Sequence, residues 1–201
     1  MTYHEQLASA AALGAAMLIG AGVSAPPARA AYVVTLAQVG PNVVATGSGT
    51  IDLAGLFLTG SGSLASFMRP SSPAIATGAT GSADGYAGAT APSNFGSGLS
   101  TLASSGSGDI VEADDIFIGV PAGYVSGAAL SDSATYDTAT FASLGVTPGT
   151  YVWTWGSGAT ADSFTLDVSA IPEPSTWALL GVGFLGLAAI GFRAHRKAEA
   201  R

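Results

Sequence analysis

Cysteine is absent from this 201-residue chain. Its absence excludes disulfide bonds, thiolate catalysis, thiolate metal sites and acylation of the lipoprotein type. A domain of about 140 residues buries enough surface to fold without covalent cross-links. The lack of cysteine is therefore compatible with export, although it does not identify a compartment by itself.

Basic residues are nearly absent between residues 31 and 169, where Arg69 is the single base. The same stretch contains ten acids: Asp52, Asp84, Asp109, Glu112, Asp114, Asp115, Asp132, Asp137, Asp162 and Asp167. Ten acids against one base leave nine net negative charges there, compared with -7 for the whole chain. Proteins bind nucleic acids largely by neutralising phosphates with Lys and Arg, so this composition excludes a nucleic-acid partner.

The usual groups that activate a nucleophile are also missing from this region. It contains no His, Cys or Lys, because His4 and His195 lie near the two ends of the chain. Ser-His-Asp triads, Ser-Lys dyads, Schiff-base chemistry and His-ligated zinc are therefore excluded. Two-carboxylate chemistry stays open in principle, but Glu112 is the sole glutamate and the aspartates are dispersed. We expect no enzymatic activity and no cofactor.

The amino-terminal segment has the pattern of a secretory signal peptide. An uncharged apolar run, Leu7–Val23, is followed by a Pro-containing break and then by Ala28, Arg29 and Ala30. Small residues at Ala28 and Ala30 form the small-x-small pattern that signal peptidase cuts, with Ala31 as the first mature residue. We therefore predict a signal peptide over residues 1–30. An uncleaved membrane anchor is the alternative, and the lack of Lys and Arg in residues 1–6 departs from the usual pattern.

The carboxy-terminal segment predicts a transmembrane helix at about residues 176–192. Its apolar run, Trp177–Phe192, has no charge, and at about 1.5 Å per residue it is shorter than a hydrocarbon core of about 30 Å. A basic tail follows over residues 193–201, containing Arg193, His195, Arg196, Lys197 and Arg201. The positive-inside tendency keeps this tail cytoplasmic and places the acidic region outside.

Pro172, Glu173 and Pro174 precede this helix, and the prolines keep the segment extended. The run of tripeptide, apolar helix and basic tail over residues 170–201 resembles the PEP-CTERM sorting domain. This resemblance implies recognition by exosortase, a membrane transpeptidase-like enzyme, and cleavage near the tripeptide. It also implies a Gram-negative bacterium that makes exopolysaccharide. The alternative is that Pro-Glu-Pro is only a stiff spacer before a tail anchor.

The pattern of residues 31–169 predicts a mainly β ectodomain between the signal helix and the transmembrane helix. We expect this domain to be an antiparallel sandwich or jelly-roll-like. The strands that we predict cover Tyr32–Leu36, Asn42–Ala45, Thr50–Leu53, Ile116–Val120, Thr150–Trp155 and Phe164–Val168. The last two form a hairpin through residues 156–162. A short helix is predicted over Thr138–Leu144 with Asp137 as its N-cap. Recurrent Gly-Ser-Gly triplets indicate turns, and Ser71–Gly108 indicates long loops or partial disorder.

Two groups of side chains are candidates for ligand binding. The acids Asp109, Glu112, Asp114 and Asp115 could hold Ca²⁺, although a solvated acidic loop explains them as well. The aromatic residues Tyr151, Trp153 and Trp155 alternate along one strand. They could form a platform for a sugar ring, or they could face the core.

The sequence therefore predicts an exported, non-enzymatic surface or extracellular-matrix protein, associated with exopolysaccharide or biofilm. Its precursor would be anchored in the inner membrane through the carboxy-terminal helix, and signal peptidase and exosortase would process it. The mature form would lie at the cell envelope, the outer surface or the extracellular matrix. The alternative is a carbohydrate- or calcium-binding β module displayed at the cell surface.

Overall fold

The computed structural model describes residues 31–169, which form two β-sheets, one short α-helix and one turn of 3₁₀-helix, Gly158–Thr160. The first sheet has six strands, in the order β12 (Gly149–Trp155), β13 (Asp162–Ser169), β1 (Ala31–Val39), β2 (Asn42–Thr50), β11 (Ala129–Tyr136) and β8 (Ser105–Gly108). The second has seven strands, in the order β3 (Phe57–Leu64), β6 (Gly81–Ala87), β10 (Phe117–Pro121), β9 (Val111–Asp114), β5 (Ala74–Thr77), β4 (Phe67–Arg69) and β7 (Thr101–Leu102).

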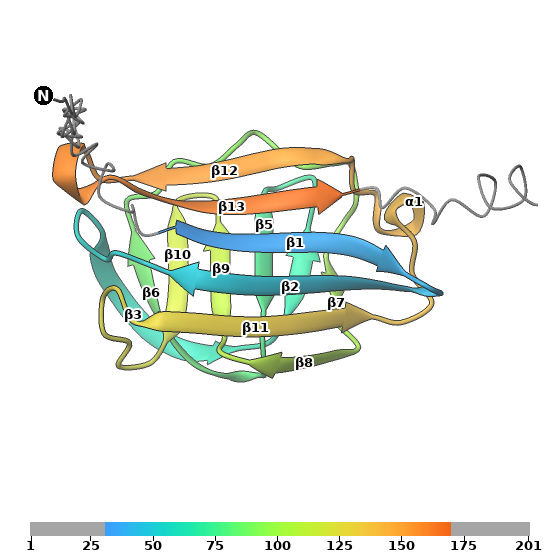
Figure 1. Cartoon of the computed structure of the whole chain (residues 1–201), viewed down its shortest axis with the longest axis horizontal. Coiled ribbons are helices and arrows are strands. Elements are labelled where there is room, and N and C mark those ends of the chain that lie inside the picture. The colour runs from blue at the N-terminus through green and yellow to red at the C-terminus, as the bar shows by residue number, and fades with distance from the viewer. Residues whose placement is uncertain (1–30, 170–201) are drawn as a thin grey trace, which may run out of the picture.

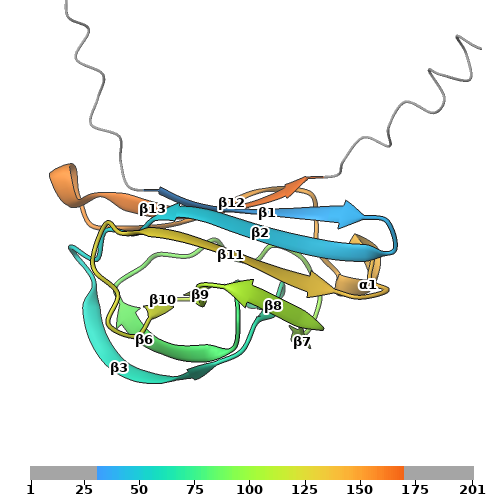
Figure 2. The same ribbon diagram turned by 60° about the horizontal axis from the view of Figure 1, so that its bottom comes forward.

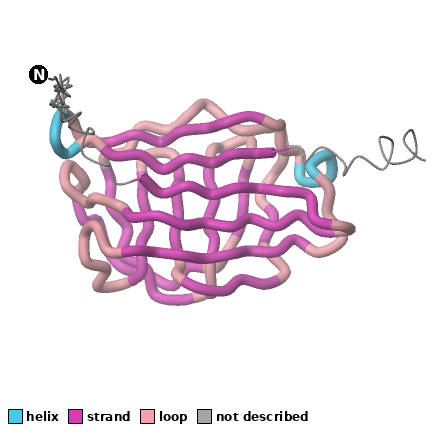
Figure 3. Tube along the Cα trace, viewed as in Figure 1, coloured by secondary structure: helices cyan, strands magenta, loops and turns pink. Residues whose placement is uncertain are grey.

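The two sheets lie in two layers, and the strands of one run across the strands of the other (Figure 1). Figure 2 shows the six-stranded sheet above the seven-stranded sheet, and Figure 3 shows how little of the described chain is helical. The prediction of a mainly β fold is confirmed. One strand pair departs from an antiparallel arrangement, because β1 and β13 run parallel with Tyr32 opposite Phe164.

Alternation of buried and outward-facing side chains explains the long strands of the first sheet. On β1, the residues Tyr32, Val34 and Leu36 are buried while their neighbours face outward. The pattern on β13 is equally regular, with Phe164, Leu166 and Val168 in the core. Both sheets contribute to one hydrophobic core, so the described residues form a sandwich whose interior lies between the two layers.

Most of the predicted strands are confirmed. They correspond to β1, β2, β10, β12 and β13, and β12 and β13 form the predicted antiparallel hairpin, in which Trp155 pairs with Asp162. The strand predicted at Thr50–Leu53 is wrong, because β2 ends at Thr50. There the chain leaves the sheet: the Ile51 amide donates to the Tyr124 hydroxyl at 3.1 Å, and the Asp52 amide donates to the Asp162 carboxylate at 2.6 Å.

The prediction of long loops or disorder over Ser71–Gly108 is largely wrong, although residues 88–100 between two of the strands do form a long loop. This stretch contains β5, β6, β7 and β8. All four residues of β5 are buried, so the strand has no alternating pattern that a sequence could reveal. Three of the Gly-Ser-Gly triplets, at residues 47–49, 60–62 and 106–108, lie in strands, which corrects their interpretation as turns.

The short helix α1 covers Phe141–Leu144 and starts later than predicted. Its N-cap is Thr140, whose hydroxyl accepts from the Ser143 amide at 3.0 Å, and not Asp137. Thr138 has φ of 52°, in the left-handed region, so the backbone does not continue as a helix from that residue. The reciprocal bonds between Thr140 and Ser143 form the capping box that fixes the true start.

Candidate functional site

The aromatic stripe on β12 faces the core, which excludes it as a sugar platform. Trp153 is 0% exposed and Trp155 is 4% exposed. The Trp153 ring packs edge-on against Phe164, with 5.4 Å between centroids, and the Trp155 indole donates to the Asp52 carbonyl at 2.7 Å. Tyr151 is half-buried on the same side of the strand. The sequence left open a sugar platform and a position in the core, and the interpretation as core residues is therefore correct.

The acids proposed as a calcium site do not gather around one point. The Asp109 carboxylate accepts from the Ser131 amide at 2.9 Å, whereas Asp114 forms an ion pair with Arg69 at 2.9 Å. Among residues 31–169, no three acidic or histidine side chains are placed to hold a metal ion together. The geometry that a calcium site needs is therefore not found in this cluster.

Glu112 instead faces the outer side of the seven-stranded sheet. Its neighbours on β9, Val111 and Ala113, lie in the core, so Glu112 and Asp114 point away from it. Glu112 begins a cross-strand row of glycines: it pairs with Gly119 on β10, which pairs with Gly85 on β6. Gly85 in turn pairs with Gly60 on the edge strand β3.

The absence of side chains in this row makes room for Glu112. A Cβ atom at Gly119 would lie 2.9 Å from the Glu112 Cβ and 3.1 Å from its Oε2, so the glutamate side chain lies across this glycine. Beside it is a cavity of about 170 Å³, which we name the Glu112 hollow. Its walls are contributed by β3, β6, β9 and β10, and Glu112 is the one ionisable residue among them.

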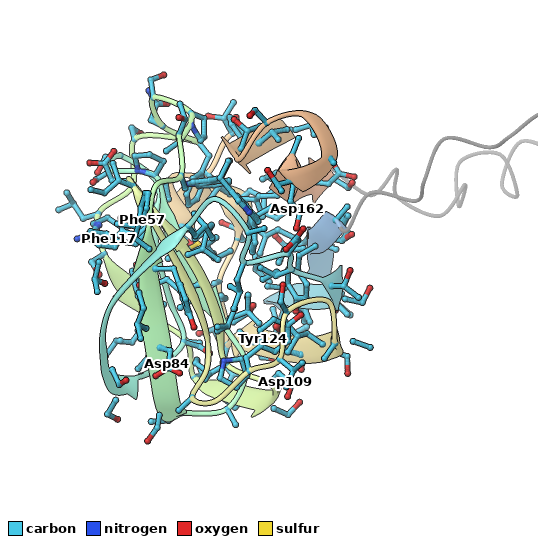
Figure 4. All side chains as sticks on the ribbon, turned by 90° about the vertical axis from the view of Figure 1, so that its left-hand side faces the viewer. Phe57, Asp84, Asp109, Phe117, Tyr124 and Asp162 are labelled. Atoms are coloured by element: carbon cyan, nitrogen blue, oxygen red, sulfur yellow. The ribbon has the colours of Figure 1, made fainter. Side chains whose placement is uncertain are left out.

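Two phenylalanines lie in the next cross-strand row of the same face. Phe57 on β3 and Phe117 on β10 both pair with Ala87 on β6, two residues along the strand from Gly85. Phe57 is 71% exposed and Phe117 is 37% exposed, and Figure 4 shows both on the outer side of the sheet. The glycine row and this aromatic pair are therefore neighbours. Phe117 and Gly119 are alternate residues of β10, and on β3 a register shift between Leu58 and Gly60 brings Gly60 opposite Gly85.

The electrostatics of this face centre on Glu112. Burial and the charge of Asp114 raise the pKa of its carboxyl, and Arg69 acts in the opposite direction, so that the pKa is about 7. Arg69 itself is engaged, because its Nη2 donates to both carboxylate oxygens of Asp114 at 2.9 and 3.1 Å. The guanidinium also lies 5.9 Å from the centre of the Phe67 ring. Glu112 is thus a half-buried carboxyl beside a cation that another acid already holds.

A second unusual acid, Asp132, lies between the sheets and was missed by the sequence analysis. The Tyr32 hydroxyl donates to its carboxylate. A Cβ atom at Gly47 would overlap both groups, so this glycine of β2 provides the space for the pair. Burial raises the pKa of both side chains. The sequence pattern could have revealed this buried acid, because Asp132 occupies an inward position in the alternating strand β11.

Most residues of the predicted processing sites lie outside the described part of the chain. These are Ala28 and Ala30, then Pro172, Glu173 and Pro174, and then Arg193, Arg196, Lys197 and Arg201. Ala31 is described, and it is the exposed first residue of β1, opposite Ser163. The cleavage site there stays a prediction. No helix within residues 31–169 is long and apolar enough to cross a membrane, and the predicted helix at 176–192 is not among those residues.

Comparison with known proteins finds a match at the end of the chain. The family model of the PEP-CTERM protein-sorting motif matches residues 170–197. No curated protein and no solved structure matches the chain. This is a protein of the exported class, directed to the envelope of a Gram-negative bacterium. It contains the PEP-CTERM sorting motif, which indicates sorting by exosortase.

Proposed function

We propose that this chain is the precursor of a non-enzymatic surface or extracellular-matrix protein, associated with exopolysaccharide or biofilm. Signal peptidase removes residues 1–30 after export across the inner membrane. The helix at about residues 176–192 then holds the precursor in that membrane, with the basic tail inside. Exosortase cuts near Pro172–Pro174, and the acidic β-sandwich is released to the envelope, the outer surface or the matrix.

The match to the PEP-CTERM motif at residues 170–197 is the observation that carries this proposal. The apolar run that follows the tripeptide spans about 24 Å at 1.5 Å per residue, less than a hydrocarbon core of about 30 Å. A short helix suits a signal that is discarded after use better than a lasting anchor. The stiff, extended Pro-Glu-Pro segment suits a protease groove, because it forms no local hydrogen-bonded structure.

Three observations support a display role over catalysis. Residues 31–169 contain no His, Cys or Lys to activate a nucleophile. A two-carboxylate mechanism needs an acid and a second free carboxylate across a cleft. The Glu112 hollow has one carboxyl in its wall, and the nearby Asp114 is bound by Arg69.

Cell fractionation of a motif variant tests the sorting proposal. The double variant Glu173→Ala, Pro174→Ala is expected to stay in the inner membrane at the size of the signal-peptidase product. The matched control is Glu199→Ala, the same glutamate change in the basic tail, which leaves the tripeptide intact and is expected to be sorted like the wild type. If the double variant has the wild-type size and location, the tripeptide has no part in sorting and the proposal is wrong.

A further inference from the structure

The Glu112 carboxyl is open to a partner from outside the domain. The carboxyl is half-buried, and within residues 31–169 no backbone or side-chain donor forms a hydrogen bond with it. The nearest cation, Arg69, is held by both oxygens of Asp114. A carboxyl that is partly desolvated and has no donor from its own domain gains from a donor or a positive charge that comes from outside.

The surroundings of Glu112 favour a ring over a peptide strand. In the floor of the hollow, Gly60 and Gly85 carry no side chains, while the Glu112 side chain covers Gly119 at one end of the row. Strands β6 and β10 are paired on both sides, so an added strand could pair only with the outer edge of β3 and would not lie over the floor of the hollow. Next to this floor, the rings of Phe57 and Phe117 are exposed and can stack against the C–H face of a sugar or receive a cation.

Charge narrows the class of saccharide further. Residues 31–169 carry nine net negative charges, and their only base is already paired. An acidic polysaccharide is repelled by such a domain, whereas one that carries ammonium groups is attracted to it. Glu112 then supplies the local partner for one ammonium at the hollow.

We propose that the Glu112 hollow, together with Phe57 and Phe117, binds a saccharide chain that carries free amino groups. The bound unit places its ring over the glycine floor and its ammonium against the Glu112 carboxylate, while the next unit lies against the two phenylalanine rings. This site differs from the aromatic stripe of β12, which is buried. The inference rests on the proposed association with polysaccharide for its setting, and it concerns the ligand alone, so failure of binding is distinguishable from failure of sorting.

The test is titration calorimetry of the full chain in a neutral detergent with fully deacetylated chitohexaose as the probe. The N-acetylated hexamer and an alginate oligomer replace the free amine by a neutral amide and by carboxylates. We expect the deacetylated hexamer to bind, the acetylated one to bind roughly tenfold more weakly, and alginate not to bind; a tenfold change corresponds to about 1.4 kcal/mol. Pentalysine is the peptide probe and is expected to bind more weakly than the deacetylated hexamer.

Two variants locate the site. Glu112→Gln removes the charge, and Gly62→Leu fills the hollow while the charge stays, because a Cβ at Gly62 meets nothing within 4 Å. Both are expected to weaken binding at least about tenfold. The matched control is Asp137→Asn, which removes an exposed negative charge from the end of β11 and is expected to change affinity less than twofold.

Four results would overturn the proposal. The first is no binding of the deacetylated hexamer. The second is an equal loss in Asp137→Asn and Glu112→Gln, which would indicate attraction by net charge alone. The third is equally tight binding of pentalysine with the same dependence on Glu112, which would indicate a cationic peptide. The fourth is a dimer that Phe57→Ala converts to a monomer, without saccharide binding, which would assign this face to a second copy of the chain.

Discussion

The Tyr32 hydroxyl and the Asp132 carboxylate meet in the interior between the two sheets. A buried polar pair stabilises a fold only while both groups stay bonded, because an unsatisfied group keeps its full desolvation cost. Tyr136 is a natural comparison: its hydroxyl is also buried, but it has no hydrogen-bond partner among the described residues. Substitutions at the two tyrosines therefore separate the contribution of the hydrogen bond to stability from the contribution of the aromatic ring.

We predict that Tyr32→Phe lowers the free energy of unfolding by about 1–3 kcal/mol, because it leaves Asp132 buried without its donor. Tyr136→Phe removes a hydroxyl that forms no bond, so it is expected to leave stability unchanged or slightly raised. Urea denaturation of both variants beside the wild type measures the difference. Equal effects of the two substitutions would show that the hydrogen bond of Tyr32 makes no net contribution to the free energy of unfolding.

Glu112 gives a prediction for the dependence of stability on pH. Its pKa is about 7 in the folded chain, against an ordinary value of 4.5. Between these values the folded state holds a proton that the unfolded state has lost, so stability falls as the pH rises. The difference between the two pKa values corresponds to a loss of about 3 kcal/mol in the free energy of unfolding. This figure is an upper limit, because Glu112 keeps some contact with water.

Replacing Glu112 by Gln is expected to remove this decline. At pH 8 the variant should unfold at a higher urea concentration than the wild type, and near pH 4.5 the two should agree. The pKa values of Asp132 and Asp162 are also raised by burial, and they contribute a similar decline in both proteins, which cancels in the comparison. An unchanged difference between the two proteins over this pH range would show that Glu112 is not desolvated as described.

At the scale of elements, β3 is the strand most exposed to new partners. It pairs only with β6, it has eight residues without a charge, and its first seven residues are exposed. A long, uncharged edge strand is a template for pairing with another chain. The edge strand β12 differs, because Thr154 exchanges two backbone hydrogen bonds with Thr90 of a covering segment.

We predict that Leu58→Lys on β3 reduces concentration-dependent association, since a lysine on an edge strand opposes pairing. Val125→Lys is the control, because Val125 is also apolar and exposed but lies outside any strand. Static light scattering over a concentration series compares the two variants with the wild type. If both lysines have the same effect, charge alone controls association and the edge of β3 does not.

Strand alternation also explains how far the sequence predicts these elements. The patterns at Tyr32–Leu36 and Phe164–Val168 are regular because one face of each strand meets the core, and both strands are predicted correctly. The strand β5 is not predicted, since burial on both faces leaves no alternation of polar and apolar residues. The hollow was missed for a different reason. Its floor joins Gly60, Gly85 and Gly119 through strand register, which a single sequence does not contain.

At the scale of the whole molecule, delivery and ligand binding belong to different parts of the chain. The sorting motif lies at residues 170–197, beyond the last strand of the sandwich. Strands β1 and β13 are parallel neighbours, so Ala31 and Ser169 lie at opposite ends of the same sheet (Figure 1). Changes in the Glu112 hollow are therefore expected to leave processing intact, and changes in the tripeptide to leave the sandwich folded.

The intact mass of the protein recovered from its producing cells tests the central claim most directly. The full chain has a mass of 19.6 kDa. Processing as proposed predicts a polypeptide that begins at Ala31 and ends near Pro172–Pro174, with neither terminal segment retained. A protein that keeps residues 176–201 in the wild type, whether or not residues 1–30 have been removed, would contradict the proposal that exosortase releases the β-sandwich.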